Sequence, residues 1–166
     1  MRIHVTGNAG SGKTTLAAEL GRRLDLPVYG LDAVVWQPGW RTTPHALRVE
    51  LESELAAGEA WVIEGVSPRI RSAADLVIFL DLPRWLCLAR CLRRCLFHPG
   101  GRAELPSDCP EWRILPYLLP LVWQFPRRAR PAILSHPRLV RLASTGQIRN
   151  FVLGLSFLRR RRPLDG

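Results

Sequence analysis

The chain has 166 residues, of which 47% are hydrophobic and 23% charged, proportions that are ordinary for one soluble globular domain. A chain of this length can bury a sufficient core without the help of disulfides or a structural metal. The formal net charge of +10 is unusual and indicates polyanionic partners such as nucleotide phosphates, nucleic acid or an anionic membrane.

The positive charge is concentrated in the second half of the chain. Residues 1–83 carry 8 basic and 10 acidic side chains, whereas residues 84–166 carry 16 arginines and 4 acidic side chains. Two interpretations stay open: these arginines bind a polyanion, or they only solvate surface helices. Of the 24 basic residues, Lys13 is the one lysine.

The first elements are a strand at Arg2–Thr6 and a helix over 13–24, separated by a glycine-rich loop. The loop, GNAGSGKT, matches the pattern G-x-x-x-x-G-K-[ST], and its position between a strand and a helix is the context that a phosphate-binding loop requires. Inward-pointing N–H groups and the helix N-terminus would hold phosphate, and a threonine hydroxyl would hold Mg²⁺. The predicted nucleotide-binding residues are Gly7, Asn8, Ala9, Gly10, Ser11, Gly12, Lys13, Thr14 and Thr15.

Lys13 fits this loop better than arginine would. A compact ammonium on a thin stem reaches the β- and γ-phosphate oxygens, whereas a planar guanidinium is too wide for a tight loop. The chain thus has its one lysine at the position where an arginine should not fit the loop. We therefore assign Lys13 a catalytic role.

The remaining chain continues to alternate strands and helices. Strands are predicted at Val28–Gly30, Trp61–Ile63, Leu76–Leu80 and Leu139–Ala143, and helices at 44–58, 83–97 and 146–158. This alternation predicts an α/β fold with a parallel sheet and right-handed crossovers. A long excursion, residues 98–137, is rich in proline, arginine and tryptophan, and residues 159–166 form a basic tail.

The four cysteines and the apolar segments indicate less about function than the phosphate loop does. Cys87, Cys91 and Cys95 recur every four residues and predict packing along one helix face; zinc bound by Cys95, His98 and Cys109 is the alternative. No secretory signal is visible at the N-terminus, and the most apolar stretch, 114–123, is too short to span a bilayer. We therefore expect a cytoplasmic protein without a membrane span.

The phosphate loop alone leaves several classes of protein open. GTPases need an N/T-K-x-D motif, which a chain without a second lysine cannot contain, and RecA- or AAA-type ATPases usually need a longer chain. Small kinases are the remaining class.

Three segments, VTGNAGSGKTTLA, YGLDAVVWQPGW and WVIEGVSPRIRSAADLVIFLDLPRW, resemble the FlaR-like "DNA topology modulation" group of small P-loop proteins, which are related to adenylate and shikimate kinases. The resemblance covers roughly residues 1–158, which we expect to form a single domain. It implies a three-layer P-loop fold with a five-stranded parallel sheet in the order 2-3-1-4-5, and a helical lid over about 98–137. ATP and Mg²⁺ are the implied substrate and cofactor.

Acidic residues at the strand ends match kinase positions. Asp32 follows the second strand, where a carboxylate accepts a proton from a substrate hydroxyl; a turn-forming aspartate is the alternative. Glu64 stands where related kinases carry an aspartate that holds Mg²⁺ through water. Asp81 ends the run LVIFLD and is the weaker metal candidate.

Basic and aromatic residues complete the predicted site. Arg69 and Arg71 follow the Glu-Gly turn, where related kinases grip the acceptor. Arg90 and Arg94 share one face of the helix before the lid and are the candidate lid arginines. Trp36 either stacks on a ring-bearing acceptor or packs against the following helix. Ser144–Gly146 is the expected adenine-edge loop or a plain turn.

The sequence therefore predicts an ATP- and Mg²⁺-dependent kinase that acts on a small hydroxyl- or phosphate-bearing acceptor. The alternative is a nucleic-acid-associated P-loop ATPase or regulator, which the arginine-rich second half would favour. A third interpretation, a membrane-surface contact through 112–125 and the arginine tail, also stays open.

Overall fold

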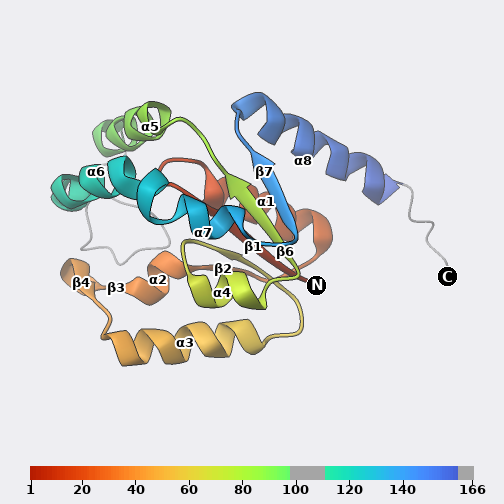
Figure 1. Ribbon diagram of the computed structural model, residues 1–166, viewed down its shortest axis with the longest axis horizontal. Helices are drawn as coiled ribbons and strands as arrows, with labels where there is room; N and C mark the ends of the chain where they lie inside the picture. Colours follow the sequence, from red (N-terminus) through yellow and green to blue (C-terminus); the bar gives the residue numbers. More distant parts are fainter. Residues whose placement is uncertain (98–110, 161–166) are drawn as a thin grey trace.

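The computed structural model describes residues 1–97 and 111–160 and shows a parallel sheet with helices on both faces (Figure 1). The strands of this sheet are β1 Arg2–Gly7, β2 Val28–Gly30, β5 Trp61–Glu64, β6 Leu76–Leu80 and β7 Leu139–Leu142. Their spatial order is β2-β5-β1-β6-β7, with every neighbouring pair parallel. Numbered along the chain among themselves, the five strands follow the order 2-3-1-4-5, which confirms the predicted sheet.

The central strands are buried on both faces, as their continuous apolar sequences predict. Ile3 and Val5 of β1 pack on one face against Leu16 and Leu20 of α1, which spans Lys13–Leu24. Helix α8, Thr145–Arg160, covers the same face beside β7. These side chains form the larger core cluster beneath the phosphate loop.

The opposite face is covered by shorter helices. Helices α3, His45–Ala57, and α4, Pro68–Ala73, pack over Trp61 and Ile63. Helix α7, Arg130–Leu134, buries Ile133 against Val77 and Phe79. The sheet thus lies in the middle of three layers (Figure 1).

Two helices, α5 at Arg84–Phe97 and α6 at Glu111–Arg128, lie side by side at one end of the molecule (Figure 1). Val122 of α6 is buried with Leu82, Cys87 and Cys91, so α6 is anchored to α5 and to the segment after β6.

A short excursion follows β2. It consists of α2, Leu31–Val35, and an antiparallel pair, β3 Trp36–Gln37 and β4 Arg41–Thr42, joined by the 3₁₀ turn η1, Pro38–Trp40. In this turn Gly39 and Trp40 both have positive φ, 73° and 58°. The tryptophan is therefore held in a conformation that a bulky residue rarely adopts.

The predicted long helices at 44–58, 83–97 and 146–158 are confirmed to within two residues at each end. Helices α2, α4, α6 and α7 were not predicted as separate elements. Helix α6 was missed because Pro116, Pro120 and Pro126 lie inside it, and proline ordinarily argues against a helix interior. The predicted lid stays a prediction: 98–110 lie outside the described residues, and α6 and α7 pack on the body of the domain.

Cysteine packing is confirmed for Cys87 and Cys91, which are fully buried, while Cys95 is half-buried. Burial raises the pKa of Cys87 to about 11, so this thiol stays protonated and apolar in character. The alternative zinc set includes His98 and Cys109, which lie outside the described residues. Within residues 1–97 and 111–160 no three His, Cys, Asp or Glu side chains gather as a metal-binding group. No helix in that part of the chain is both long and apolar enough to cross a membrane.

Candidate active site

The predicted phosphate loop runs from the end of β1 to the start of α1, at the carboxyl edge of the central strand. Gly10 and Gly12 have φ of +75° and +95°, a region that favours glycine. The Ser11 N–H donates to the Asn8 carbonyl at 3.2 Å, which closes the loop, and Gly12 is the N-cap of α1. The loop and the helix N-terminus therefore form the kind of concave, N–H-rich surface that binds anions.

Lys13 folds back over this loop. Its Nζ donates to the Asn8 carbonyl oxygen at 3.0 Å, and the side chain is half-buried. The ammonium therefore lies on the loop, within reach of an anion bound there.

Thr14 and Glu64, the two main metal-ligand candidates, are in direct contact. The Thr14 hydroxyl donates to Glu64 Oε1 at 3.0 Å, although 50 residues separate them in the chain. Glu64 ends β5, beside Val5 of β1, and is 4% exposed. Hydroxyl and carboxylate oxygens are the ligands that Mg²⁺ prefers, so this pair fits a magnesium ion.

Asp32 lies at the same edge of the sheet, in the first turn of α2. Gly30, two residues earlier, pairs with Glu64, and a Cβ built at Gly30 would lie 3.4 Å from Glu64 Oε1. The neighbouring Trp36 contacts Trp40 edge-on at 5.2 Å between ring centroids, and Tyr117 of α6 at 6.4 Å. The aromatic residues thus join the excursion after β2 to α6.

Arg69 and Arg71 lie on α4, whose first turn is fixed by Ser67. The Ser67 hydroxyl accepts the Ile70 N–H at 3.3 Å and donates to Glu52 Oε2 of α3 at 2.7 Å. Arg69 is exposed, whereas Arg71 is partly buried, and burial lowers its pKa from the usual value. Residues two apart do not share a helix face, so the two guanidinium groups diverge.

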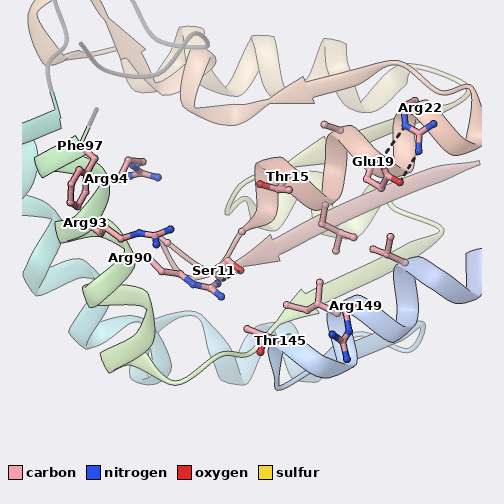
Figure 2. A pocket seen from close by; sticks show the side chains of 16 residues that line it. Ser11, Thr15, Glu19, Arg22, Arg90, Arg93, Arg94, Phe97, Thr145 and Arg149 are labelled. Atoms are coloured by element: carbon pink, nitrogen blue, oxygen red, sulfur yellow. Dashed lines mark hydrogen bonds and ion pairs between the residues drawn. The ribbon is translucent and has the colours of Figure 1, made fainter. Parts of the chain in front are cut away.

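A pocket of about 1220 Å³ adjoins the other side of the loop (Figure 2). It is lined by residues 10–12 of the phosphate loop and by side chains of α1, α5 and α8. Arg90 Nη1 donates to the Ser11 carbonyl at 3.4 Å, and Arg93 and Arg94 point toward the same space (Figure 2). Arg22 and Arg149 also line this pocket, and among the described lining residues Glu19, which is paired with Arg22, is the one acid.

Thr145, from the loop that was expected at the adenine edge, lines this pocket as well. The Ser144 hydroxyl accepts the Gln147 N–H at 3.1 Å, and Gln147 Oε1 accepts the Ala143 N–H at 2.7 Å. These bonds fix the start of α8 as a capping box does.

No protein-family profile matches the chain, and no protein of curated function matches it. Solved structures do match, over almost the whole chain. Shikimate kinase from Bacteroides thetaiotaomicron is 21% identical, with 96% of this chain and 98% of that chain covered and a TM-score of 0.60. Shikimate kinase from Acinetobacter baumannii, solved in complex with shikimate, is 18% identical over 99% of this chain and 95% of that chain, with a TM-score of 0.54. Shikimate kinase from Aquifex aeolicus is 20% identical over 98% of this chain and 100% of that chain, with a TM-score of 0.53.

The chain has the fold of a small P-loop kinase. At 18–21% identity this likeness concerns the fold, and the resemblance to the FlaR-like group stays a prediction.

Within the P-loop kinase fold, the Asp81 carboxylate forms ion pairs with two arginines. Its carboxylate accepts from Arg130 Nε at 3.0 Å and from Arg141 at 2.7 Å. These ion pairs join the end of β6 to α7 and β7. They give Asp81 a structural explanation, and it remains the weaker metal candidate.

Several residues around the site were not predicted. The Asn8 side chain donates to the Val122 carbonyl of α6 at 2.8 Å, and Tyr117 reaches Trp36. Arg149 also lines the pocket without having been predicted, whereas Arg93, which lines it too, lies on the helix of the candidate lid arginines. Arg149 did carry a sequence signal, because it lies one helical turn after Thr145 on the predicted last helix. The contacts of α6 required the fold.

Proposed function

We propose that the protein transfers the γ-phosphoryl group of ATP, in the presence of Mg²⁺, to a small acceptor that carries a hydroxyl or phosphate group. The observation that carries the proposal is the convergence of Lys13, the Thr14–Glu64 pair and Asp32 at one edge of the sheet. P-loop kinases need a phosphate cradle, a metal site and an acceptor base at that place.

The roles on the phosphate side follow from chemistry. The N–H groups of the loop and the Lys13 ammonium bind phosphate oxygens and hold the γ-phosphate in line with the acceptor. Thr14 and Glu64 would hold Mg²⁺, Glu64 through water, and the ion would neutralise phosphate charge. Arg90, which contacts the loop at Ser11, adds positive charge where negative charge spreads in the transition state.

The acceptor side is formed by Asp32, Trp36 and the α4 arginines. Asp32 accepts the proton of the acceptor hydroxyl as its oxygen bonds to the γ-phosphorus and the bond to the ADP oxygen breaks. Arg69 is exposed near the end of β5 and is free to pair with an anionic group on the acceptor. Trp36 offers a flat apolar surface, which favours an acceptor with a ring.

The pocket between α1, α5 and α8 is proposed to receive the nucleoside part of ATP. Its contact with the loop at residues 10–12 supports this, because a nucleoside must lie next to its own phosphates. Arginine planes from α5 stack readily on a purine base.

The test is ADP release with Mg²⁺ and a panel of acceptors: nucleoside monophosphates, nucleosides, shikimate and gluconate, each followed by mass analysis of the product. We expect one class of acceptor to raise ADP release and to gain one phosphoryl group. Single- and double-stranded DNA are the comparison arms. Stimulation by DNA with no phosphorylated product would overturn the kinase proposal and favour a nucleic-acid-dependent ATPase.

A further inference from the structure

Helix α6 contains three prolines whose missing N–H groups have different consequences. Proline cannot donate to the carbonyl four residues earlier, so Pro116, Pro120 and Pro126 remove the usual helical donors of Trp112, Pro116 and Val122. Trp112 and Pro116 are exposed, and water can satisfy their carbonyls. Val122 is fully buried, so its carbonyl needs a donor from the protein.

Asn8 of the phosphate loop supplies that donor. Its Nδ2 donates to the Val122 carbonyl at 2.8 Å across 114 residues of sequence, and the Asn8 residue is 5% exposed. Its Oδ1 accepts the Ala9 N–H at 2.9 Å. The opposite amide orientation would place oxygen against carbonyl and N–H₂ against N–H, so these two partners define one orientation.

The same residue organises the rest of the loop. The Asn8 main-chain carbonyl accepts from the Ser11 N–H at 3.2 Å and from Lys13 Nζ at 3.0 Å. One residue therefore connects α6 to the loop closure and to the ammonium. Helix α6 in turn carries Tyr117, which contacts Trp36 beside the proposed acceptor site.

We propose that Pro126 and Asn8 form a matched pair: the proline frees a buried carbonyl of α6, and the asparagine uses it to position α6 on the phosphate loop. Asn8 is thus a positioning residue that links the nucleotide loop to the helix bearing Tyr117. The structural half of this proposal stands on geometry alone. The functional half, that nucleotide binding stabilises α6 through Asn8, rests on the proposed function.

A double-mutant cycle in thermal unfolding tests the pair. Asn8→Ala should lower Tm by about 5 °C or more, because it leaves the buried Val122 carbonyl without a donor. Pro126→Ala restores an N–H at position 126, so Asn8→Ala in that background should lower Tm by less than about 2 °C. The loss of the Ala9 contact is common to both backgrounds and cancels.

Pro120→Ala is the matched control, because it restores an N–H in the same helix to an exposed carbonyl. In the Pro120→Ala background, Asn8→Ala should lower Tm by as much as it does in the wild-type protein. If Asn8→Ala lowered Tm equally in the wild-type, Pro126→Ala and Pro120→Ala backgrounds, Pro126 and Asn8 would not be a matched pair.

Amide hydrogen exchange tests the positioning role. Saturating MgADP should slow exchange over residues 118–126 in the wild-type protein. This slowing should vanish in Asn8→Ala/Pro126→Ala, in which the Val122 carbonyl regains a helical donor but no longer binds the phosphate loop. Equal slowing in both proteins would contradict the positioning role. Absence of MgADP binding to the wild-type protein would refute the proposed function and the positioning role together, while the unfolding cycle would still decide the pair.

Discussion

At the scale of single residues, Lys13 is the one lysine beside 23 arginines, and we expect the phosphate loop to require it. Its Nζ lies on the loop at 3.0 Å from the Asn8 carbonyl, a position that a slender ammonium can occupy within the turn. Thr14 and Glu64 likewise meet at 3.0 Å. In the proposed reaction these neighbouring residues have separate tasks: Lys13 places charge on the phosphates, and Thr14 and Glu64 provide oxygen ligands for a metal.

Glu64→Gln should raise the Mg²⁺ concentration required for half-maximal turnover about tenfold or more, since an amide orients metal-bound water less well than a carboxylate. Turnover should recover in part at high Mg²⁺. The measurement is a Mg²⁺ titration of ADP release, with the exposed Glu59→Gln as control. An unchanged titration curve would remove Glu64 from the metal site.

The sequence predicted Lys13 and Thr14 because their spacing within one loop is a local pattern. The partners of Asn8 and Asp81 could not be predicted in this way. Asn8 meets Val122 across 114 residues, and Asp81 meets Arg130 and Arg141 across 49 and 60. Such contacts depend on how distant elements pack, which no motif spacing encodes. Asp81 therefore resembled a metal ligand in sequence, although the fold surrounds it with arginines.

At the scale of elements, α5 and the phosphate loop approach each other more closely than a side chain would permit. A Cβ at Gly10 would collide with the Cys87 carbonyl and lie 2.9 Å from Cys91 Sγ, whereas a Cβ at Gly12 would meet nothing within 4 Å. Both glycines have positive φ. They therefore separate the effect of backbone strain from the effect of helix packing.

Gly10→Ala should lower the free energy of unfolding by about 3 kcal/mol, from strain plus overpacking against α5. Gly12→Ala should lower it by about 1 kcal/mol, from strain alone. Urea unfolding of both variants measures the difference. Equal losses would show that α5 does not press on the loop.

The long, periodic elements could be predicted from the sequence, while α6 could not. The three prolines of α6 argue locally against a helix, and packing of Val122 and Leu118 against α5 overrides that local preference. The short helix α4 also escaped prediction, because six residues show no helical periodicity.

At the scale of the whole molecule, His4 lies at the centre of the fold. It is fully buried in the central strand, and its Nε2 lies 3.1 Å from the Gly65 carbonyl, which can only accept. Burial is the main cause that lowers the pKa of His4 to about 3; the charges of Arg71, His136 and Lys13 also lower it. The imidazole is therefore neutral in the folded protein.

Because the folded pKa lies below the unfolded value of about 6.5, the unfolded chain binds the extra proton as the pH falls. Stability is thus fully present above about pH 6.5 and is lost progressively below it, by about 2 kcal/mol at pH 5. Urea unfolding at pH 5 and pH 7 measures this loss. His4→Gln keeps a donor for the Gly65 carbonyl and cannot titrate, so it should flatten the pH dependence; an unchanged dependence would assign it to other groups.

The most direct test of the account is transfer of labelled phosphate from γ-³²P ATP to the acceptor identified by the panel, compared between wild type and Lys13→Met. We predict that the substitution lowers transfer by a factor of about 100 or more, with Tm unchanged to within about 2 °C. Undiminished transfer by Lys13→Met would contradict the account, because the loop that defines the proposed site would then not carry the reaction.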